Sequence, residues 1–290
     1  MNLDAVTVLA TSGVLLVVAL VIGWAVLRRT TFRRRPRPSR APPPAAWRGL
    51  IAERVAITRG LAEEEWDGLL ALIQEFLRDK RFEGRNGVEV TEEMRVLIAA
   101  QACLLILHLN VGCYPRVRSV LIYPDTFVPR RPPFDGRLYE GPLSPPEPLL
   151  GEFMSGVVVL SWESVEQGAH DGNVVLHEFA HELDRQDGYV DGIPLLEPPS
   201  STRTWARVLN ERFVELRRDV ALGRETALSA YGATNRAEFF AVATEGFFTR
   251  PRVLQASYPD LYGELREFYR QDPAARADAS PLPEAQSQAD

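Results

Sequence analysis

The pattern of apolar and polar positions divides the chain into an apolar head and a longer body with helical periodicity. Residues 5–27 contain no charged side chain in 23 positions. From Trp47 onward, apolar residues recur mainly at three- and four-residue spacing, as in 63–78, where they lie opposite acidic and polar positions. This periodicity predicts amphipathic helices that bury one face in a common core.

The body is predicted to be mainly helical with a small β-sheet, which is an α+β fold. A helix over 91–109 is apolar on nearly every side, so we expect it to be buried, with Cys103 and His108 as core residues rather than metal ligands. Short buried strands are expected at 117–128 and 156–161. Further helices are expected at 171–184, 202–220, 236–248 and 259–270. The tail 271–290 has almost nothing to bury and is expected to be disordered.

The apolar head has the properties of a membrane span. A helix over 5–27, preceded by the short tail 1–4, would be about 35 Å long, enough to cross a hydrocarbon core of about 30 Å. Asp4 precedes the span and seven arginines follow it, the reverse of a cleaved signal peptide. Because arginines near a span stay in the cytoplasm, we expect a single-pass protein of the plasma (inner) membrane with its N-terminus outside. The Arg/Pro-rich segment 28–46 is predicted to be a tether to a cytoplasmic domain over 47–270.

Composition and charge exclude several functional classes. The 290 residues are 46% hydrophobic and 25% charged, as in globular proteins. Two cysteines are too few for a disulfide framework or a cysteine-rich zinc module. Seven arginines and one aspartate give residues 1–40 a charge of +6, so the rest of the chain carries −12. An acidic body is a poor surface for nucleic acid, and we expect no direct binding to it.

The strongest chemical signal is an H-E-x-x-H motif in the helix predicted over 171–184. His177 and His181 are one helical turn apart on the same face, so both imidazoles can reach one metal ion. Glu178 lies beside them, close enough to take a proton from a water molecule at the metal. A catalytic zinc site needs three protein ligands and an open position, so a third ligand must come from elsewhere.

The residues alone do not identify the third metal ligand, for which Asp187, Glu238 and Glu245 are candidates. Asp187 lies at the spacing of an extended motif, but residue 184 is aspartate where a glycine would allow the chain to turn. Glu238 and Glu245 lie seven residues apart on one face of an apolar helix, and their spacing does not separate them. Glu238 is alternatively a capping-box residue. Asp184 either orients an imidazole or is a solvated residue at the helix end.

A family resemblance narrows these alternatives. The segment HEFAHELD at 177–184, followed by 231–245, resembles the MtfA (Mlc titration factor A) family of zinc-dependent peptidases, and the likeness spans about residues 50–273. Supporting segments lie at 78–83, 99–104, 157–162 and 268–273. The resemblance implies a compact, zincin-type α+β metallopeptidase core. It also implies one Zn²⁺ per chain held by His177, His181 and Glu238, with Glu178 as the catalytic glutamate and Tyr231 near the metal.

The predicted function is zinc-dependent hydrolysis of peptide bonds. Glu178 is expected to act as general base and then as proton donor, and Tyr231 to donate a hydrogen bond to the oxyanion, unless that tyrosine only packs in a turn. The strand expected at 157–161 is a candidate for pairing with an extended peptide. Whether the enzyme trims termini or cuts internally is left open by the sequence.

The resemblance also implies a protein partner, a glucose-responsive transcriptional repressor of sugar uptake. The alternative function is therefore a membrane-tethered protein that binds a regulator and whose zinc site is structural or vestigial. The presence of Glu178 favours the peptidase, because a structural site needs no general base.

Overall fold

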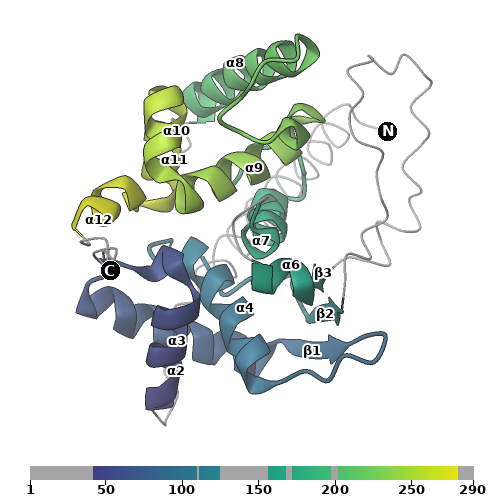
Figure 1. Cartoon of the computed structure of the whole chain (residues 1–290), viewed down its shortest axis with the longest axis vertical. Helices are drawn as coiled ribbons and strands as arrows, with labels where there is room; N and C mark the ends of the chain where they lie inside the picture. Colours follow the sequence, from purple (N-terminus) through teal and green to yellow (C-terminus); the bar gives the residue numbers. More distant parts are fainter. Residues whose placement is uncertain (1–41, 110, 125–155, 168–171, 197–201, 280–290) are drawn as a thin grey trace, which may run out of the picture.

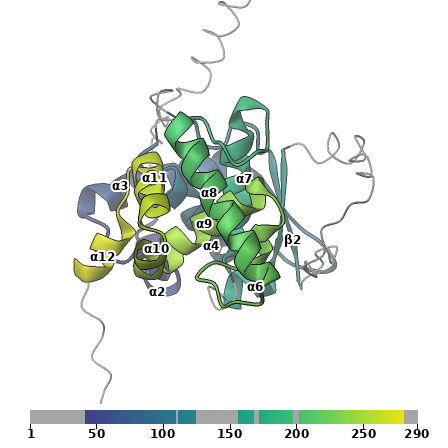
Figure 2. The same ribbon diagram turned by 90° about the horizontal axis from the view of Figure 1, so that it is seen from above.

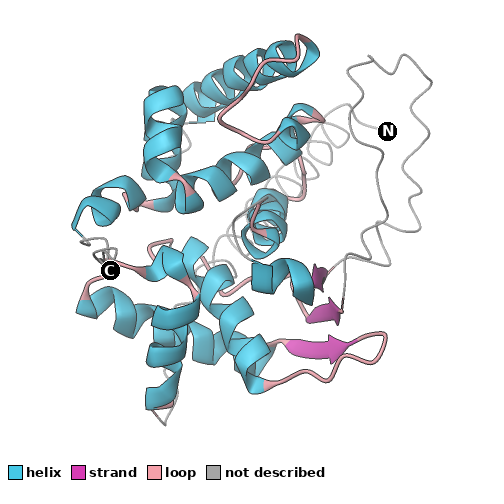
Figure 3. Ribbon diagram, viewed as in Figure 1, coloured by secondary structure: helices cyan, strands magenta, loops and turns pink. Residues whose placement is uncertain are grey.

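The computed structural model describes residues 42–109, 111–124, 156–167, 172–196 and 202–279. Helices dominate this part of the chain and three short strands form one sheet, which confirms the predicted α+β class (Figure 3). The helices are α2 (Ala45–Arg54), α3 (Glu63–Asp79), α4 (Glu92–Leu105), α6 (Trp162–Gln167), α7 (Val174–Asp184), α8 (Thr202–Ala221), α9 (Arg236–Thr249), α10 (Pro251–Ser257), α11 (Pro259–Tyr269) and α12 (Pro273–Ala279). The strands are β1 (Arg81–Gly84), β2 (Ser119–Tyr123) and β3 (Val157–Ser161).

Helix α7, which carries the H-E-x-x-H motif, lies in the middle of the molecule (Figure 1). It packs against α4 and β3 on one side and against α9 on the other. Helices α8 and α11 pack on α9 from outside, as the turned view shows (Figure 2). The motif helix is therefore held between two groups of helices that are far apart in sequence.

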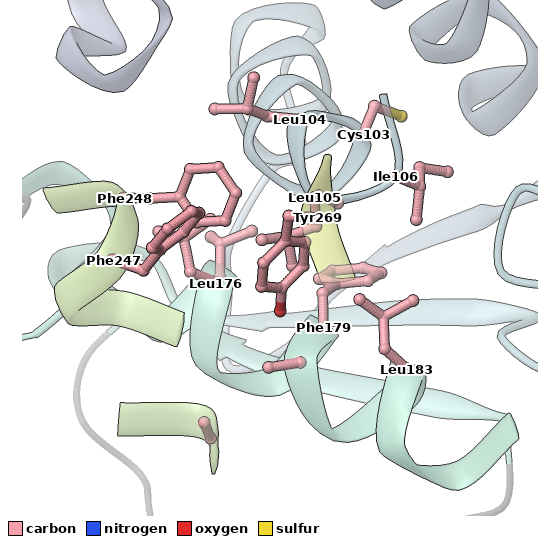
Figure 4. Close-up of a cluster of buried hydrophobic side chains, with 14 of the residues drawn as sticks. Cys103, Leu104, Leu105, Ile106, Leu176, Phe179, Leu183, Phe247, Phe248 and Tyr269 are labelled. Carbon is pink, nitrogen blue, oxygen red and sulfur yellow. The ribbon is translucent and has the colours of Figure 1, made fainter. Parts of the chain in front are cut away.

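The apolar face of α7 fixes its rotation about its own axis. Leu176, Phe179 and Leu183 recur at helical spacing on that face and are each at most 1% exposed. They point into a cluster with residues of α4 and the ring of Tyr269 (Figure 4). The Phe179 ring also meets that of Tyr114 edge to face, with 4.7 Å between centroids. Because this face is buried, the two histidines of the motif emerge on another side of the helix.

The sheet has the order β1-β2-β3, and both strand pairs are parallel. Val120 of β2 pairs with Val158 of β3, and both are at most 2% exposed. Alternate residues of β3 thus face the core, as a half-buried strand requires. Within the described residues β3 is an edge strand, and it runs beside α7.

Two expectations about the body are wrong. His108 is not a core residue: α4 ends at Leu105, and the half-buried His108 ring lies 2.8 Å from Glu65. Cys103 is fully buried, as expected. The tail is not disordered from residue 271, because 273–279 form α12 and Gln271 donates a 2.8 Å hydrogen bond to the carbonyl of Leu104. Ala274 of α12 is also buried, at 3% exposed, and one small apolar side chain with a polar contact leaves little hydrophobic pattern in the sequence.

The predicted N-terminal tail, membrane span and most of the tether lie outside the described residues. The tether as predicted, 28–46, is two residues too long, because α2 begins at Ala45. Among the helices that the structure describes, none has both the length and the apolar character that a membrane crossing requires.

We expect Phe179→Ala to lower the free energy of unfolding by about 3–5 kcal/mol, because it removes a fully buried ring that orients α7. Chemical denaturation measures the loss. Leu222→Ala is the control, since that side chain is 57% exposed and its truncation should change stability by less than about 0.5 kcal/mol. Equal losses in the two variants would contradict the packing described for α7.

Candidate metal centre

The two histidines of the motif are positioned by the way α7 begins. The Asn173 side chain accepts a 3.0 Å hydrogen bond from the Leu176 amide and so caps the helix. His177 and His181 then lie one turn apart with their ring centroids 4.8 Å from each other. Their Nε2 atoms are 3.2 Å apart, so both rings point at the same position in space.

Glu238 completes this arrangement from α9. Asn235 caps α9 by accepting a 3.0 Å hydrogen bond from the Glu238 amide, which places Glu238 in the first turn of the helix. Its side chain is directed at α7 rather than back at the cap. Oε2 of Glu238 lies 3.0 Å from Nε2 of His177 and 3.3 Å from Nε2 of His181. Glu238 is only 7% exposed, so this carboxylate needs a partner of opposite charge.

The three ligand atoms fit a tetrahedral metal ion. They form a nearly equilateral triangle with edges of 3.0, 3.2 and 3.3 Å. Ligand atoms about 2.0–2.1 Å from a tetrahedral zinc ion are spaced about 3.3 Å apart. Two imidazole nitrogens and one carboxylate oxygen are also a usual donor set for zinc. Within the described residues, His177, His181 and Glu238 are the group able to hold a metal ion.

Charge at the site favours a cation. Burial alone would lower the pKa of His177, but hydrogen bonds to Glu238 and Glu245 outweigh it and raise the pKa to about 10. Burial would raise the pKa of Glu238, but the contacts with His177 and His181 hold it well below its usual range. The carboxylates thus favour positive charge on the ring, and a metal ion binding there competes with a proton.

Glu178 follows His177 directly and is half-buried at the same site. Its burial raises its pKa above the ordinary value for glutamate, and the neighbouring histidines oppose that rise. A carboxylate with a raised pKa holds a proton more readily, which suits a group that must first accept a proton and then return it.

The structure places Tyr231 beside the candidate metal site. It lies in the short 3₁₀ turn Ala230–Ala233 before α9, with its ring centroid 5.8 Å from that of His177. The side chain is 41% exposed, so it is not a packed core tyrosine. Tyr231 is thus a partly exposed side chain in ring contact with His177.

The other acidic candidates lie apart from the triangle of ligand atoms. Glu245 contacts the opposite nitrogen of His177, with 2.6 Å between Oε1 and Nδ1. Asp187 accepts a 2.9 Å hydrogen bond from the Tyr189 amide. Asp184 is neither solvated nor an imidazole partner: it is fully buried and binds the Gly192 amide, and burial raises its pKa to about 6. The two expectations for Asp184 were therefore both wrong.

Sequence reasoning missed the contribution of Gln101. Its Oε1 accepts a 2.6 Å hydrogen bond from Nδ2 of Asn173, which ties the start of α7 to α4. A glutamine within an apolar helix signals a buried polar contact. Its partner is 72 residues away along the chain, so the sequence did not identify it.

The H-E-x-x-H motif and a distant glutamate together form a candidate metal site. The sequence profile of one family, described as glucose-regulated metallo-peptidase M90, matches residues 29–270. The chain belongs to this family. The match includes most of the Arg/Pro-rich segment 28–46, which the likeness over 50–273 had left outside the family core.

Individual relatives agree with this assignment. The chain is 32% identical to Mlc titration factor A of Pectobacterium atrosepticum, over 79% of this chain and 87% of the relative. It is 31% identical to Mlc titration factor A of Escherichia fergusonii, over 86% of this chain and 94% of the relative. An uncharacterised protein of Synechocystis is 34% identical over 86% and 90%. The resemblance to the MtfA family is confirmed.

We expect the purified protein to bind about one zinc ion per chain and Glu238→Ala to lose it, because the variant removes one corner of the triangle. The loss of affinity should exceed the roughly 10–100-fold that removal of an outer partner costs. Metal analysis after dialysis measures the content, with Glu211→Ala on the exposed surface of α8 as control. Retention of zinc by Glu238→Ala would remove Glu238 from the site.

Proposed function

We propose that the protein is a zinc-dependent peptidase whose metal is held by His177, His181 and Glu238. The observation that carries this proposal is the triangle of ligand atoms, with edges of 3.0–3.3 Å, beside the acidic residue Glu178. Membership of a metallopeptidase family supports it. When bound, zinc supplies a Lewis acid that polarises a peptide carbonyl and makes water acidic enough to lose a proton near pH 7.

Glu178 and Tyr231 provide the proton transfer and the hydrogen bonding that the reaction also requires. Glu178 accepts the proton of the attacking water and delivers it to the leaving amine, and its half-buried position and raised pKa support this role. Tyr231 donates a hydrogen bond to the carbonyl oxygen as negative charge develops there, which its place beside His177 supports.

The substrate is an extended peptide that pairs with the edge of β3. Support comes from the position of β3 at the edge of the described sheet and from its packing beside α7. An edge strand presents unpaired backbone N–H and C=O groups to a partner strand. Pairing there would bring the backbone of the substrate alongside the motif helix.

We expect Glu178→Gln to lower kcat for peptide hydrolysis by about 10²–10⁴-fold and to leave zinc content unchanged, because the amide cannot take a proton and is not a metal ligand. A fluorogenic peptide library measures the rate, and metal analysis of the same sample gives the zinc content. Undiminished hydrolysis by the zinc-loaded variant would remove Glu178 from this role.

The second candidate function is binding of a transcriptional regulator, and the relatives named Mlc titration factor A support it. It is compatible with peptidase activity. Glu178→Gln separates the two functions, since a binding surface outside the site is unaffected by that change. A protein that binds the regulator and never hydrolyses peptides would match the alternative with a structural or vestigial zinc site.

We also propose that residues 5–27 anchor the protein in the plasma (inner) membrane, with the peptidase domain in the cytoplasm. The support is the uncharged 23-residue stretch and the arginines after it. The full-length protein is expected in the membrane pellet after an alkaline carbonate wash, and a chain lacking residues 1–41 in the supernatant. Full-length protein in the washed supernatant would contradict the anchor.

A further inference from the structure

Glu245 connects two parts of the structure through its two carboxylate oxygens. Oε1 lies 2.6 Å from Nδ1 of His177, and Oε2 accepts a 2.6 Å hydrogen bond from the amide of Asn173. Glu238 and Glu245 are seven residues apart on α9, which is two helical turns. One helix therefore provides a carboxylate to each ring nitrogen of the same histidine.

The chain before α7 is shaped around this carboxylate. Gly172 has φ +130°, a backbone conformation that other residues rarely adopt, and a Cβ there would lie 2.7 Å from Oε2 of Glu245. The next residue, Asn173, donates its amide hydrogen to that oxygen and caps α7 with its side chain. The absence of a side chain at Gly172 thus leaves Glu245 room to reach the start of the helix.

The two histidines of the motif differ in the hydrogen bonding of their Nδ1 atoms. Nδ1 of His181 is buried and has no hydrogen-bond partner among the described residues. Nδ1 of His177 is held by Glu245. An acceptor at Nδ1 keeps the ring proton on that nitrogen, so the lone pair of the neutral ring is on Nε2, the atom that faces Glu238.

We propose that Glu245 is a positioning residue for the metal centre. It holds the His177 ring in the tautomer and orientation that present Nε2 to the metal, and it makes that ring a stronger donor than His181. The inference rests on the proposed metal site. Carboxylate partners of ligating imidazoles act in this way in metal sites generally, and their loss weakens metal binding by about 10–100-fold.

Glu245→Gln is the sharpest variant because an amide cannot make both contacts. Its single oxygen accepts either from His177 or from the Asn173 amide. Its NH₂ group, which can only donate, then faces the N–H group of the other partner, which needs an acceptor. We expect zinc affinity to fall by about 10–100-fold, measured by chelator competition on the full-length protein in detergent. We also expect the absorption spectrum of the Co²⁺-loaded protein to change, since the His177 ring moves.

Gln101→Leu is the matched control for helix docking. It removes the 2.6 Å contact with Asn173 but leaves Glu245 and His177 untouched. We expect a lower melting temperature, zinc affinity within about threefold of wild type and an unchanged Co²⁺ spectrum, since only the anchoring of α7 is weakened. Equal losses of affinity in the two variants would show that Glu245 acts only by docking α7, which overturns the positioning role.

The remaining outcomes separate this inference from the proposed function. A folded wild type that binds no zinc overturns the metal site and the role of Glu245 with it. A wild type that binds zinc, with Glu245→Gln equal to it in affinity and Co²⁺ spectrum, overturns the positioning role alone. If Glu245→Gln fails to fold, Gly172→Ala tests the same contact with Glu245 and His177 chemically unchanged, because its Cβ would lie 2.7 Å from Oε2 and push that oxygen away. Its melting temperature is measured alongside its zinc affinity, since the positive φ of residue 172 also strains an alanine there.

Discussion

The central interaction of the molecule is the placement of His177 between two carboxylates of α9. Glu238 is 3.0 Å from one ring nitrogen and Glu245 is 2.6 Å from the other. These contacts join the helix with the H-E-x-x-H motif to the helix with the distant glutamate. The orientation of the His177 ring and the approach of Glu238 to both histidines depend on this pairing of helices.

The contact between His177 and the two glutamates is stable only when positive charge lies between the carboxylates. Two glutamates brought together beneath the surface would repel each other and lose their hydration, which is costly unless positive charge lies between them. In the metal-free protein the ring of His177 carries that charge, with its pKa raised to about 10. A divalent ion replaces the proton and adds charge. Metal binding and the stability of the α7–α9 contact are therefore coupled.

Much of the fold could be predicted because its signals are local. Apolar spacing gave α3 and α8 to within about a residue of their ends, and i, i+4 geometry alone places His177 beside His181. Short elements such as β1 and α12 were missed, because four to seven residues carry little periodicity and are held by contacts with distant segments. Helix α4 ended four residues early, at Leu105, for which the apolar pattern gave no signal.

The choice between Glu238 and Glu245 illustrates the limit of sequence reasoning about the site. Both lie on one face of α9, so periodicity treats them alike. Only the way α9 lies across α7 decides that the first turn faces Nε2 and the third faces Nδ1. The same long-range packing buries Asp184 against the Gly192 amide, although it ends an amphipathic helix and the sequence indicated either solvent or an imidazole partner.

The most direct test of the central claim is X-ray absorption spectroscopy at the zinc edge of the loaded, full-length protein. The structure predicts four light ligands: two imidazole nitrogens at about 2.0–2.1 Å, one carboxylate oxygen at about 2.0–2.2 Å, and one further oxygen from solvent. Multiple scattering from two imidazoles should be visible. A spectrum with one imidazole or none, or with a sulfur shell near 2.3 Å from Cys103 or Cys113, would contradict the assigned centre.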